Sequence, residues 1–452
     1  MKILIINDLN DYQKEIKNHF SLTKGYYFGM GLSKLLKHRV YFLTTGKTSK
    51  DRNLTFINSK EITEEFLSDL NLLLLIKEGN LVKIMESYEL IKDWIMNEHR
   101  PINQRVGIKS DSLSWVYSQG NIKDFNDKYN LNFVHFVAKQ FDIIFVQTEE
   151  YKKFGYNILH QRFGKKVADK VNEKIFISRM GVPNELPFNN SLENPYDINH
   201  SYCIDNYYRL KRDESENNNN DKESKALHPL CYTLRNRPYS KKNIKDYNKS
   251  KTILIYMGRI KVDGGRILYL MSDIMKELGS EYELHIFPGR FELPDVDVKV
   301  FSPKYMDNLQ TLRDTMFYKN DNVIIHVPYI TETKTKWLQN ADIGIDFSSS
   351  RPLNKRTEAG HAKLLEYCYY GLKVVAEKNI CNSYLVEKAD SGILLDNIGN
   401  VKEYVKAIRE IREKEVNKIH TSKKTIEDSN WDKIALEFSN YLDMIKDPLL
   451  ES

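Results

Sequence analysis

Short apolar runs alternate with amphipathic stretches along most of this chain, and this alternation limits its fold more than any other feature. The stretches between the runs, such as Gly29–Lys37, place apolar residues three and four positions apart, which is typical of helices. Strands separated by helices form βαβ units, so we predict doubly wound parallel sheets of the α/β class. The predicted strands are Ile3–Ile6, Val40–Leu43, Leu72–Ile76, Val106–Ile108, Ile143–Val146, Ile175–Ser178, Thr252–Met257, Leu284–Phe287, Val323–His326, Ile343–Phe347, Val374–Ala376 and Ile393–Leu395.

The alternation stops between Ser191 and Ser250. This interval contains the run Asn217–Asn220 and dispersed charges, with no sustained periodicity. We interpret 191–250 as a polar, Asn-rich insertion or linker that is partly disordered. The chain then divides into an N-terminal domain over 1–190, a C-terminal domain over 251–428 and a last helical segment over 429–452.

Composition excludes several classes of protein. Hydrophobic residues make up 41% of the chain, enough for more than one core, so disorder throughout is excluded. The formal net charge of +6 is too small for a dedicated nucleic-acid binder, and residues 1–190 carry a basic surplus of this same size. The four cysteines form no CxxC pair, and no His, Cys or Asp cluster has metal-ligand spacing. With no signal peptide and no apolar run longer than Leu72–Ile76, we expect a soluble, cytoplasmic protein.

The strongest chemical signal lies between Ala341 and Ala376. A predicted strand ends in a Ser- and Pro-rich loop, and a helix then begins near Gly360. Glu358 lies in the loop and Glu366 on the helix, with seven residues between them. Ligands of open parallel sheets bind beyond the carboxyl ends of the strands, where helix N-termini hold anions. The segment therefore favours a site for sugar, phosphate and ribose groups.

These residues resemble the retaining GT-B glycosyltransferases of family 4. The E-x7-E pattern follows an Ala-Asp strand and precedes a Gly-Leu-x-Val-Val-Ala strand. Further similar segments are 256–260 (YMGRI), 285–289 (HIFPG), 176–184 (FISRMGVPN) and 24–36. The resemblance implies the GT-B fold, in which two Rossmann-like domains face each other across a cleft. It also implies that the acceptor binds the first domain and that the helix near Trp431–Ile445 packs back on that domain.

The resemblance also implies roles for individual residues. Glu366 would bind the nucleotide ribose, Glu358 would lie at the donor sugar, and Arg259 would neutralise the departing diphosphate. The other residues that it places at the donor are Gly360, His361, Ala362 and Lys363 at the start of the helix, and Gly25, Gly29 and Gly258 in glycine loops.

Two positions depart from the family pattern. The second cation of the family aligns with Gly264, so Lys261 or Arg266 would have to supply that charge. The histidine that often follows the strand at Val106–Ile108 is replaced by Lys109-Ser110-Asp111, which makes Asp111 the candidate for its catalytic role.

The resemblance implies metal-independent transfer of a sugar, with retention, from a nucleotide sugar that is UDP- or GDP-linked. The acceptor would be a glycan, a lipid-linked molecule or a protein, with peripheral membrane contact through the N-terminal domain as a further option and no nucleic acid. An epimerase or phosphorylase on the same fold and a non-catalytic nucleotide-sugar-binding module remain alternatives. A dehydrogenase is disfavoured, because no predicted strand is followed by G-x-G-x-x-G.

Overall fold

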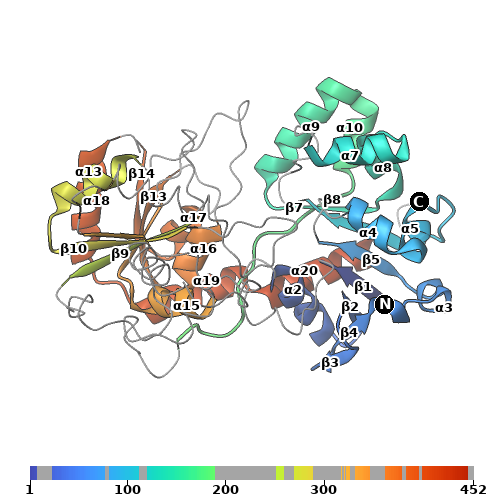
Figure 1. Cartoon of the computed structure of the whole chain (residues 1–452), viewed down its shortest axis with the longest axis horizontal. Helices are drawn as coiled ribbons and strands as arrows, with labels where there is room; N and C mark the ends of the chain where they lie inside the picture. The colour runs from blue at the N-terminus through green and yellow to red at the C-terminus, as the bar shows by residue number, and fades with distance from the viewer. Residues whose placement is uncertain are drawn as a thin grey trace, which may run out of the picture. The chain divides into compact units, whose positions relative to one another are not determined.

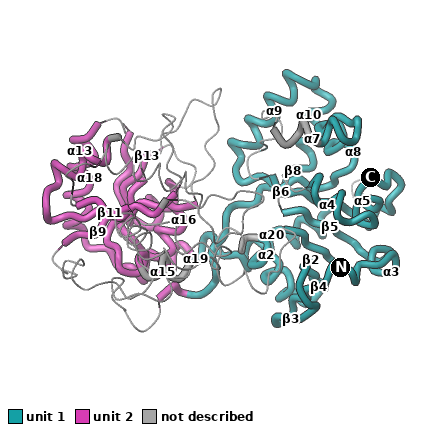
Figure 2. The backbone as a smooth tube through the Cα atoms, viewed as in Figure 1, with its two compact units in different colours: residues 1–185, 352–360, 426–452 teal, residues 186–351, 361–425 magenta. Residues whose placement is uncertain are grey.

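The computed structural model describes residues 1–7, 23–76, 81–110, 113, 120–188, 251–258, 269–288, 317, 320, 322–325, 331–346, 362–378, 383–396 and 400–445. These residues belong to two compact units (Figures 1 and 2). The described residues of unit 1 fall within 1–185 and 426–452, and those of unit 2 within 186–425. The interval 191–250, interpreted above as a polar insertion, lies outside the described residues.

Unit 1 is built on an 8-stranded sheet with the order β3-β4-β2-β1-β5-β6-β7-β8. Neighbouring strands pair in parallel, except that β3 and β4 form an antiparallel hairpin at the edge. The chain starts in the middle of the sheet and builds it outward in both directions, which makes the sheet doubly wound. The strands are β1 (Lys2–Ile6), β2 (Arg39–Thr44), β3 (Ser49–Asp51), β4 (Leu54–Asn58), β5 (Leu72–Leu75), β6 (Arg105–Lys109), β7 (Ile143–Val146) and β8 (Ile175–Ile177).

Helices cover both faces of this sheet. Along β1, Ile3 and Ile5 belong to the apolar cluster that includes α2 and α20, whereas Leu4 and Ile6 belong to the cluster that includes α4, α5 and α8. Because both faces are buried, residues 3–6 of the strand are all apolar, and only Lys2, at its partly exposed start, is polar. The helical segments are α2 (Thr23–Lys34), η2 (Ser59–Glu61), α3 (Glu64–Ser68), α4 (Leu81–Ser87), α5 (Glu89–Met96), α7 (Gly120–Tyr129), α8 (Phe133–Gln140), α9 (Glu149–Phe163), α10 (Lys165–Asn172) and α20 (Trp431–Met444).

Helix α20 comes from the far end of the sequence but packs within unit 1. The Phe438 ring lies 4.8 Å from that of Phe145 on β7 and 5.5 Å from that of Phe28 on α2, centroid to centroid. At Gly31 of α2, a Cβ atom would lie 2.8 Å from the Cβ of Ala435, so only glycine lets the two helices approach this closely. The exposed pair Lys34–Asp432, at 2.6 Å, adds a contact at the surface of the same interface.

Replacing Phe438 by Ala should therefore destabilise unit 1 by about 3–5 kcal/mol, the usual cost of removing a fully buried phenyl ring. Leu436→Ala, on the exposed side of the same helix, is the matched control and should change the free energy of unfolding by less than about 1 kcal/mol. Urea unfolding of the two variants and the parent protein measures both changes. Equal effects of the two substitutions would contradict the packing of α20 in this core.

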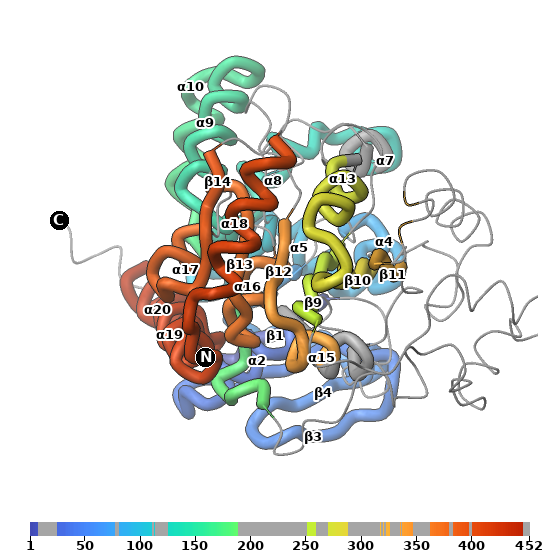
Figure 3. Tube along the Cα trace, turned by 90° about the vertical axis from the view of Figure 1, so that its left-hand side faces the viewer, coloured from blue at the N-terminus to red at the C-terminus, as the bar shows by residue number. Residues whose placement is uncertain are grey.

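Unit 2 is built on a 6-stranded, fully parallel sheet with the order β11-β10-β9-β12-β13-β14. It too starts in the middle, at β9, runs outward to β11, and resumes on the other side of β9 with β12. Figure 3 shows β14, β13, β12, β9 and β10 following one another across the unit. The strands are β9 (Thr252–Gly258), β10 (Tyr282–Pro288), β11 (Val323–Ile325), β12 (Ile343–Ile345), β13 (Lys373–Glu377) and β14 (Gly392–Leu395).

The helices of unit 2 lie on the two faces of its sheet. Helices α13 and α18 share an apolar cluster with one face, and α16 and α17 lie on the other (Figure 1). The helices are α13 (Tyr269–Leu278), α15 (Thr331–Asn340), α16 (Ala362–Tyr369), α17 (Ser383–Lys388) and α18 (Val401–Glu413), followed by α19 (Lys418–Ser429), within which the division between the units falls.

The predicted fold class is confirmed, since both units are doubly wound α/β structures and every predicted strand coincides with a strand of the structure. Two details were not predicted correctly. The hairpin β3–β4 was missed: Ser49–Asp51 is a short polar edge strand, and in β4 a threonine interrupts the apolar residues Leu54, Phe56 and Ile57. The helix expected over Gly29–Lys37 begins earlier, at Thr23, and ends at Lys34. In the described parts of the chain, no helix is long and apolar enough to cross a membrane.

His285 of β10 is fully buried in unit 2, where its ring centroid lies 4.0 Å from that of Trp337. Its Nε2 lies 2.8 Å from the Glu283 carboxylate, which in turn faces Lys251 at 3.4 Å. Burial lowers the pKa of His285 below its ordinary value of 6.5, and the nearby carboxylate offsets only part of this effect.

Unit 2 should therefore lose stability as the pH falls through 6.5, because the unfolded chain then takes up a proton that the folded histidine binds less readily. This contribution is fully present above that pH. In urea unfolding between pH 7.5 and 5.5, His285→Gln should flatten the decline, whereas His420→Gln, at an exposed position, should leave it unchanged. The same slope for His285→Gln and the parent protein would refute this source of acid sensitivity.

Candidate functional site

The order of strands in unit 2 marks one place where a ligand fits best. Connections leave β9 and β12 in opposite directions along the sheet, and ligands of doubly wound sheets bind beyond the carboxyl ends of the strands at such a point. Gly258 closes β9 with a φ of 136°, a conformation that side chains other than glycine rarely adopt. Asp346 follows β12 directly and is completely buried.

Helix α16 brings a cation to this point. The Lys363 Nζ donates a hydrogen bond to the Asp346 Oδ1 at 2.9 Å and lies 4.4 Å from the ring centroid of Tyr256 on β9. Lys363 and Asp346 are both buried, so their ion pair is sheltered from solvent. The pair joins the first turn of α16 to the residues that end the two central strands.

Tyr367 joins the same helix, α16, to strand β9. Its hydroxyl oxygen accepts a hydrogen bond from the Met257 N–H at 3.0 Å and lies 3.2 Å from the Ile255 carbonyl oxygen, to which it can donate. Burial raises the pKa of Tyr367 well above its ordinary value, so the hydroxyl keeps its proton. A Cβ atom at Gly344 would lie 2.4 Å from the Tyr367 ring, which explains why β12 carries glycine there.

Glu366 lies one turn after Lys363 on α16 and is buried, with an exposed fraction of 5%. Residues 363–369 are all buried, so this helix is enclosed on all sides and Glu366 is buried with its neighbours. A carboxylate in such surroundings binds hydroxyl and amide donors more strongly than it would in water, since the local dielectric constant is low.

The structure describes six of the predicted site residues. Gly258, Ala362, Lys363 and Glu366 lie near the carboxyl end of the sheet of unit 2, and Ala362 is exposed at the start of α16. Gly25 and Gly29 lie on α2 of unit 1. The other predicted site residues are outside the described residues, and their roles stay predictions; they are Glu358, Arg259, Asp111, Gly360, His361, Lys261 and Arg266.

The two glycines of α2 differ in their surroundings. A Cβ at Gly25 would lie 3.3 Å from Asn7 and from Ile76, which follow the central strands β1 and β5 of the sheet of unit 1. Gly25 therefore lies where that sheet also changes direction. Gly29 packs deeper, since a Cβ there would lie 3.1 Å from Ile5 Cδ1 within the core.

Sequence reasoning missed Asp346 as the partner of Lys363. The predicted strand Ile343–Phe347 included Asp346, whereas β12 ends at Ile345, so the prediction did not show that this carboxylate lies at the edge where ligands bind. Within the described ranges, no group of three or more His, Cys, Asp or Glu side chains could hold a metal ion.

Comparison with known proteins adds evidence on the fold. No family model and no curated protein sequence matches the chain. Sucrose-phosphate synthase from Thermosynechococcus elongatus matches with a TM-score of 0.56 and 11% identity, over 98% of this chain and 99% of that chain. The catalytic domain of starch synthase IV from Arabidopsis thaliana, bound to ADP and acarbose, gives 0.56 and 11%, over 99% of both chains. Anabaena HepE in complex with UDP and glucose gives 0.53 and 11%, over 98% of this chain and 100% of that chain.

These similarities extend over nearly the whole length of each chain, and at 11% identity they establish the fold. The chain has the GT-B fold, and the predicted resemblance to GT-B glycosyltransferases is confirmed at that level.

The buried ion pair yields a prediction of its own. Lys363→Met should destabilise unit 2 by about 3–5 kcal/mol, because the Asp346 carboxylate then stays buried without the ammonium group that faces it. Replacing both residues, as Lys363→Met with Asp346→Asn, should recover much of that loss. Urea unfolding measures the free energies, and Lys402→Met at an exposed position is the control. A single variant as stable as the parent would show that the pair contributes nothing.

Proposed function

We propose that this protein is a glycosyltransferase that moves a sugar from a nucleotide-sugar donor to an acceptor with retention of configuration. The observation that carries this proposal is the position of the second glutamate of the E-x7-E motif. This residue, Glu366, lies on α16 beside the carboxyl ends of β9 and β12, where ligands of doubly wound sheets bind. The GT-B fold and the nucleotides named in two of the similar structures, ADP and UDP, support the same interpretation.

In this proposal, unit 2 binds the nucleotide. The Glu366 carboxylate accepts hydrogen bonds from the ribose hydroxyls, and the backbone N–H groups at the start of α16 face the diphosphate. A helix N-terminus carries about half a positive charge, which favours a phosphate there. The ion pair with Asp346 holds Lys363 in place, so its main contribution is to fix α16 relative to β9 and β12.

Transfer of the sugar requires charged groups at the leaving diphosphate and at the donor sugar. The bond between the anomeric carbon and the diphosphate oxygen breaks, the acceptor oxygen bonds to that carbon, and the acceptor hydroxyl loses its proton to the leaving diphosphate. Arg259 would neutralise the departing diphosphate, helped by Lys261 or Arg266, and Glu358 would lie at the donor sugar. Fixed charges of this kind lower the barrier because they need no reorganisation during the reaction.

The acceptor would bind unit 1, near the point where β1, β5 and Gly25 meet. The basic surplus of residues 1–190 would favour an acceptor that carries negative charge. We propose that the donor is UDP- or GDP-linked and that no metal ion takes part.

Glu366→Ala should abolish use of the donor, and Arg259→Ala should lower turnover by about a hundredfold or more if it meets leaving-group charge. The donor is first identified by thermal shift with UDP-, GDP- and ADP-sugars, because a bound ligand raises stability. Turnover is then measured as release of the nucleoside diphosphate. Glu387→Ala, an exposed glutamate of unit 2, is the matched control and should retain full activity.

The same assays separate the alternatives. Normal turnover in both Glu366→Ala and Arg259→Ala would refute the assigned site. Nucleotide-sugar binding without consumption would indicate a binding module, and conversion to an isomeric nucleotide sugar would indicate an epimerase.

A further inference from the structure

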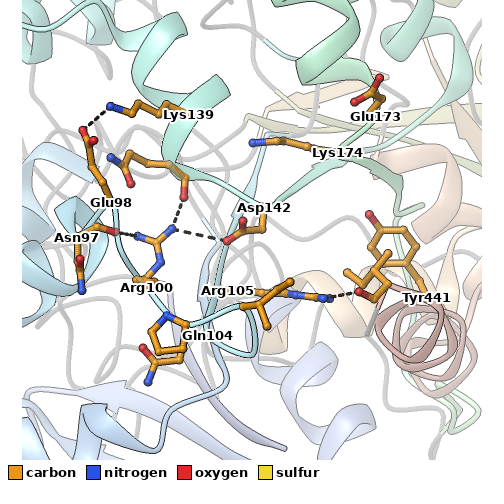
Figure 4. A pocket seen from close by; sticks show the side chains of 14 residues that line it. Asn97, Glu98, Arg100, Gln104, Arg105, Lys139, Asp142, Glu173, Lys174 and Tyr441 are labelled. Atoms are coloured by element: carbon orange, nitrogen blue, oxygen red, sulfur yellow. Dashed lines mark hydrogen bonds and ion pairs between the residues drawn. The ribbon is translucent and has the colours of Figure 1, made fainter. Parts of the chain in front are cut away.

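A polar cavity lies in unit 1, at the opposite end of the sheet from the proposed acceptor site. It has a volume of about 530 Å³ and opens where β6, β7 and β8 begin (Figure 4). Arg105 is the first residue of β6, while Asp142 and Lys174 directly precede β7 and β8. Arg100, from the loop after α5, completes the inner wall.

Positive charge predominates inside this cavity. The inner wall carries three cations, Arg100, Arg105 and Lys174, and the carboxylate of Asp142. The rim carries the Lys139–Glu98 ion pair and the exposed Glu173. Asp142 lies 3.6 Å from the Arg100 guanidinium and also accepts a hydrogen bond from the Val106 N–H at 2.8 Å. Over the whole lining, four cations stand against three carboxylates, which leaves an excess of one positive charge in a partly desolvated space.

Part of this cluster has a structural role. The Arg100 guanidinium donates to the Ile95 carbonyl oxygen at 2.8 Å and to that of Gln140 at 2.5 Å, and Lys174 Nζ donates to that of Phe141 at 2.6 Å. These carbonyl groups lie at the ends of α5 and α8, where cations are favourable. This capping of α5 and α8 uses only some of the N–H groups of the cluster.

Two buried guanidinium nitrogens have no hydrogen-bond partner among the described residues. Arg105 Nη2 donates to the Ile445 carbonyl oxygen, but its Nη1 is buried and has no hydrogen-bond partner among the described residues. The Nε of Arg100 is in the same situation, on a side chain with an exposed fraction of only 8%. A buried charged donor without an acceptor is costly, so the two guanidinium groups are not fully satisfied by the described residues around them.

We propose that this cavity binds a phosphate group. Phosphate offers several tetrahedrally arranged oxygens, which suit donors that approach from β6, from the loop after α5 and from Lys174 before β8. The cavity is large enough for a small phosphate ester, because typical ligand pockets hold about 300–1,000 Å³. Burial lowers the pKa of Lys174 to about 8, and a bound phosphate would raise it again.

Inorganic phosphate is the first probe, compared with sodium chloride at equal ionic strength. At ten times its dissociation constant, phosphate should raise the melting temperature by about 3–5 °C. Arg105→Met should weaken phosphate binding about 10–100-fold, the effect of losing a charge-assisted hydrogen bond, and Arg105→Lys should recover part of it. Lys139→Met is the matched control: it removes a charge from the rim, where Lys139 is 58% exposed and paired with Glu98 at 2.5 Å, and should change binding less than twofold.

A second measurement uses the unmodified protein and does not depend on how the variants fold. Amine labelling followed by mass spectrometry at pH 8 reports the unprotonated fraction of Lys174, with Lys139 as internal reference. Phosphate should lower the labelling of Lys174 severalfold and leave Lys139 unchanged. No stabilisation by phosphate, equal losses in Arg105→Met and Lys139→Met, or unchanged labelling of Lys174 would each overturn the proposal.

The phosphate group could belong to a soluble ester or to a lipid headgroup, and vesicles separate the two. Flotation of the protein with phosphatidylcholine vesicles that contain phosphatidic acid, lost in Arg105→Met, would support the site and assign it to a lipid. Stabilisation by inorganic phosphate without flotation would support the site and assign it to a soluble phosphate.

Discussion

Both units depend on one physical constraint: a parallel sheet must bury both of its faces. Alternate residues of β1 belong to two different apolar clusters, and the helices that carry the chain back cover both faces. Polar and charged side chains therefore concentrate at the two ends of the strands, where the sheet meets solvent. The residues at the ends of β9 and β12 and the cavity where β6, β7 and β8 begin both carry charged side chains at such strand ends.

The same constraint explains how much of the fold could be predicted. A strand that is buried on both faces is apolar at nearly every position, so runs such as Leu72–Ile76 were visible without any structure. The edge strand Ser49–Asp51 is partly exposed, and its pairing with β4 is set by neighbours and not by its own residues. The prediction that the helix near Trp431–Ile445 packs on the first domain came from family resemblance, and its contact with α2 was not predicted, because periodicity shows that a helix is amphipathic but not which surface it covers.

The candidate site was predictable to a lesser extent. Glu366 could be selected because it is the second glutamate of the E-x7-E motif, and Lys363 because it lies three residues earlier at the start of the same helix. The pairing of Lys363 with Asp346 depends on how α16 packs against the end of β12, which spacing alone does not determine. The phosphate cavity was missed entirely, since Arg100, Arg105 and Lys174 come from separate elements and form no motif.

The Lys363–Asp346 pair also changes the charge balance of the proposed reaction. Its two charges cancel over 2.9 Å within a buried site, so Lys363 adds little net positive potential at the diphosphate. A departing diphosphate would then be met by Arg259, by the N-terminus of α16 and by one further cation. Since Gly264 aligns with the family's second cation, that cation would have to be Lys261 or Arg266. Turnover should therefore depend on one of these two residues more strongly than on Lys363, whose loss would act mainly through stability.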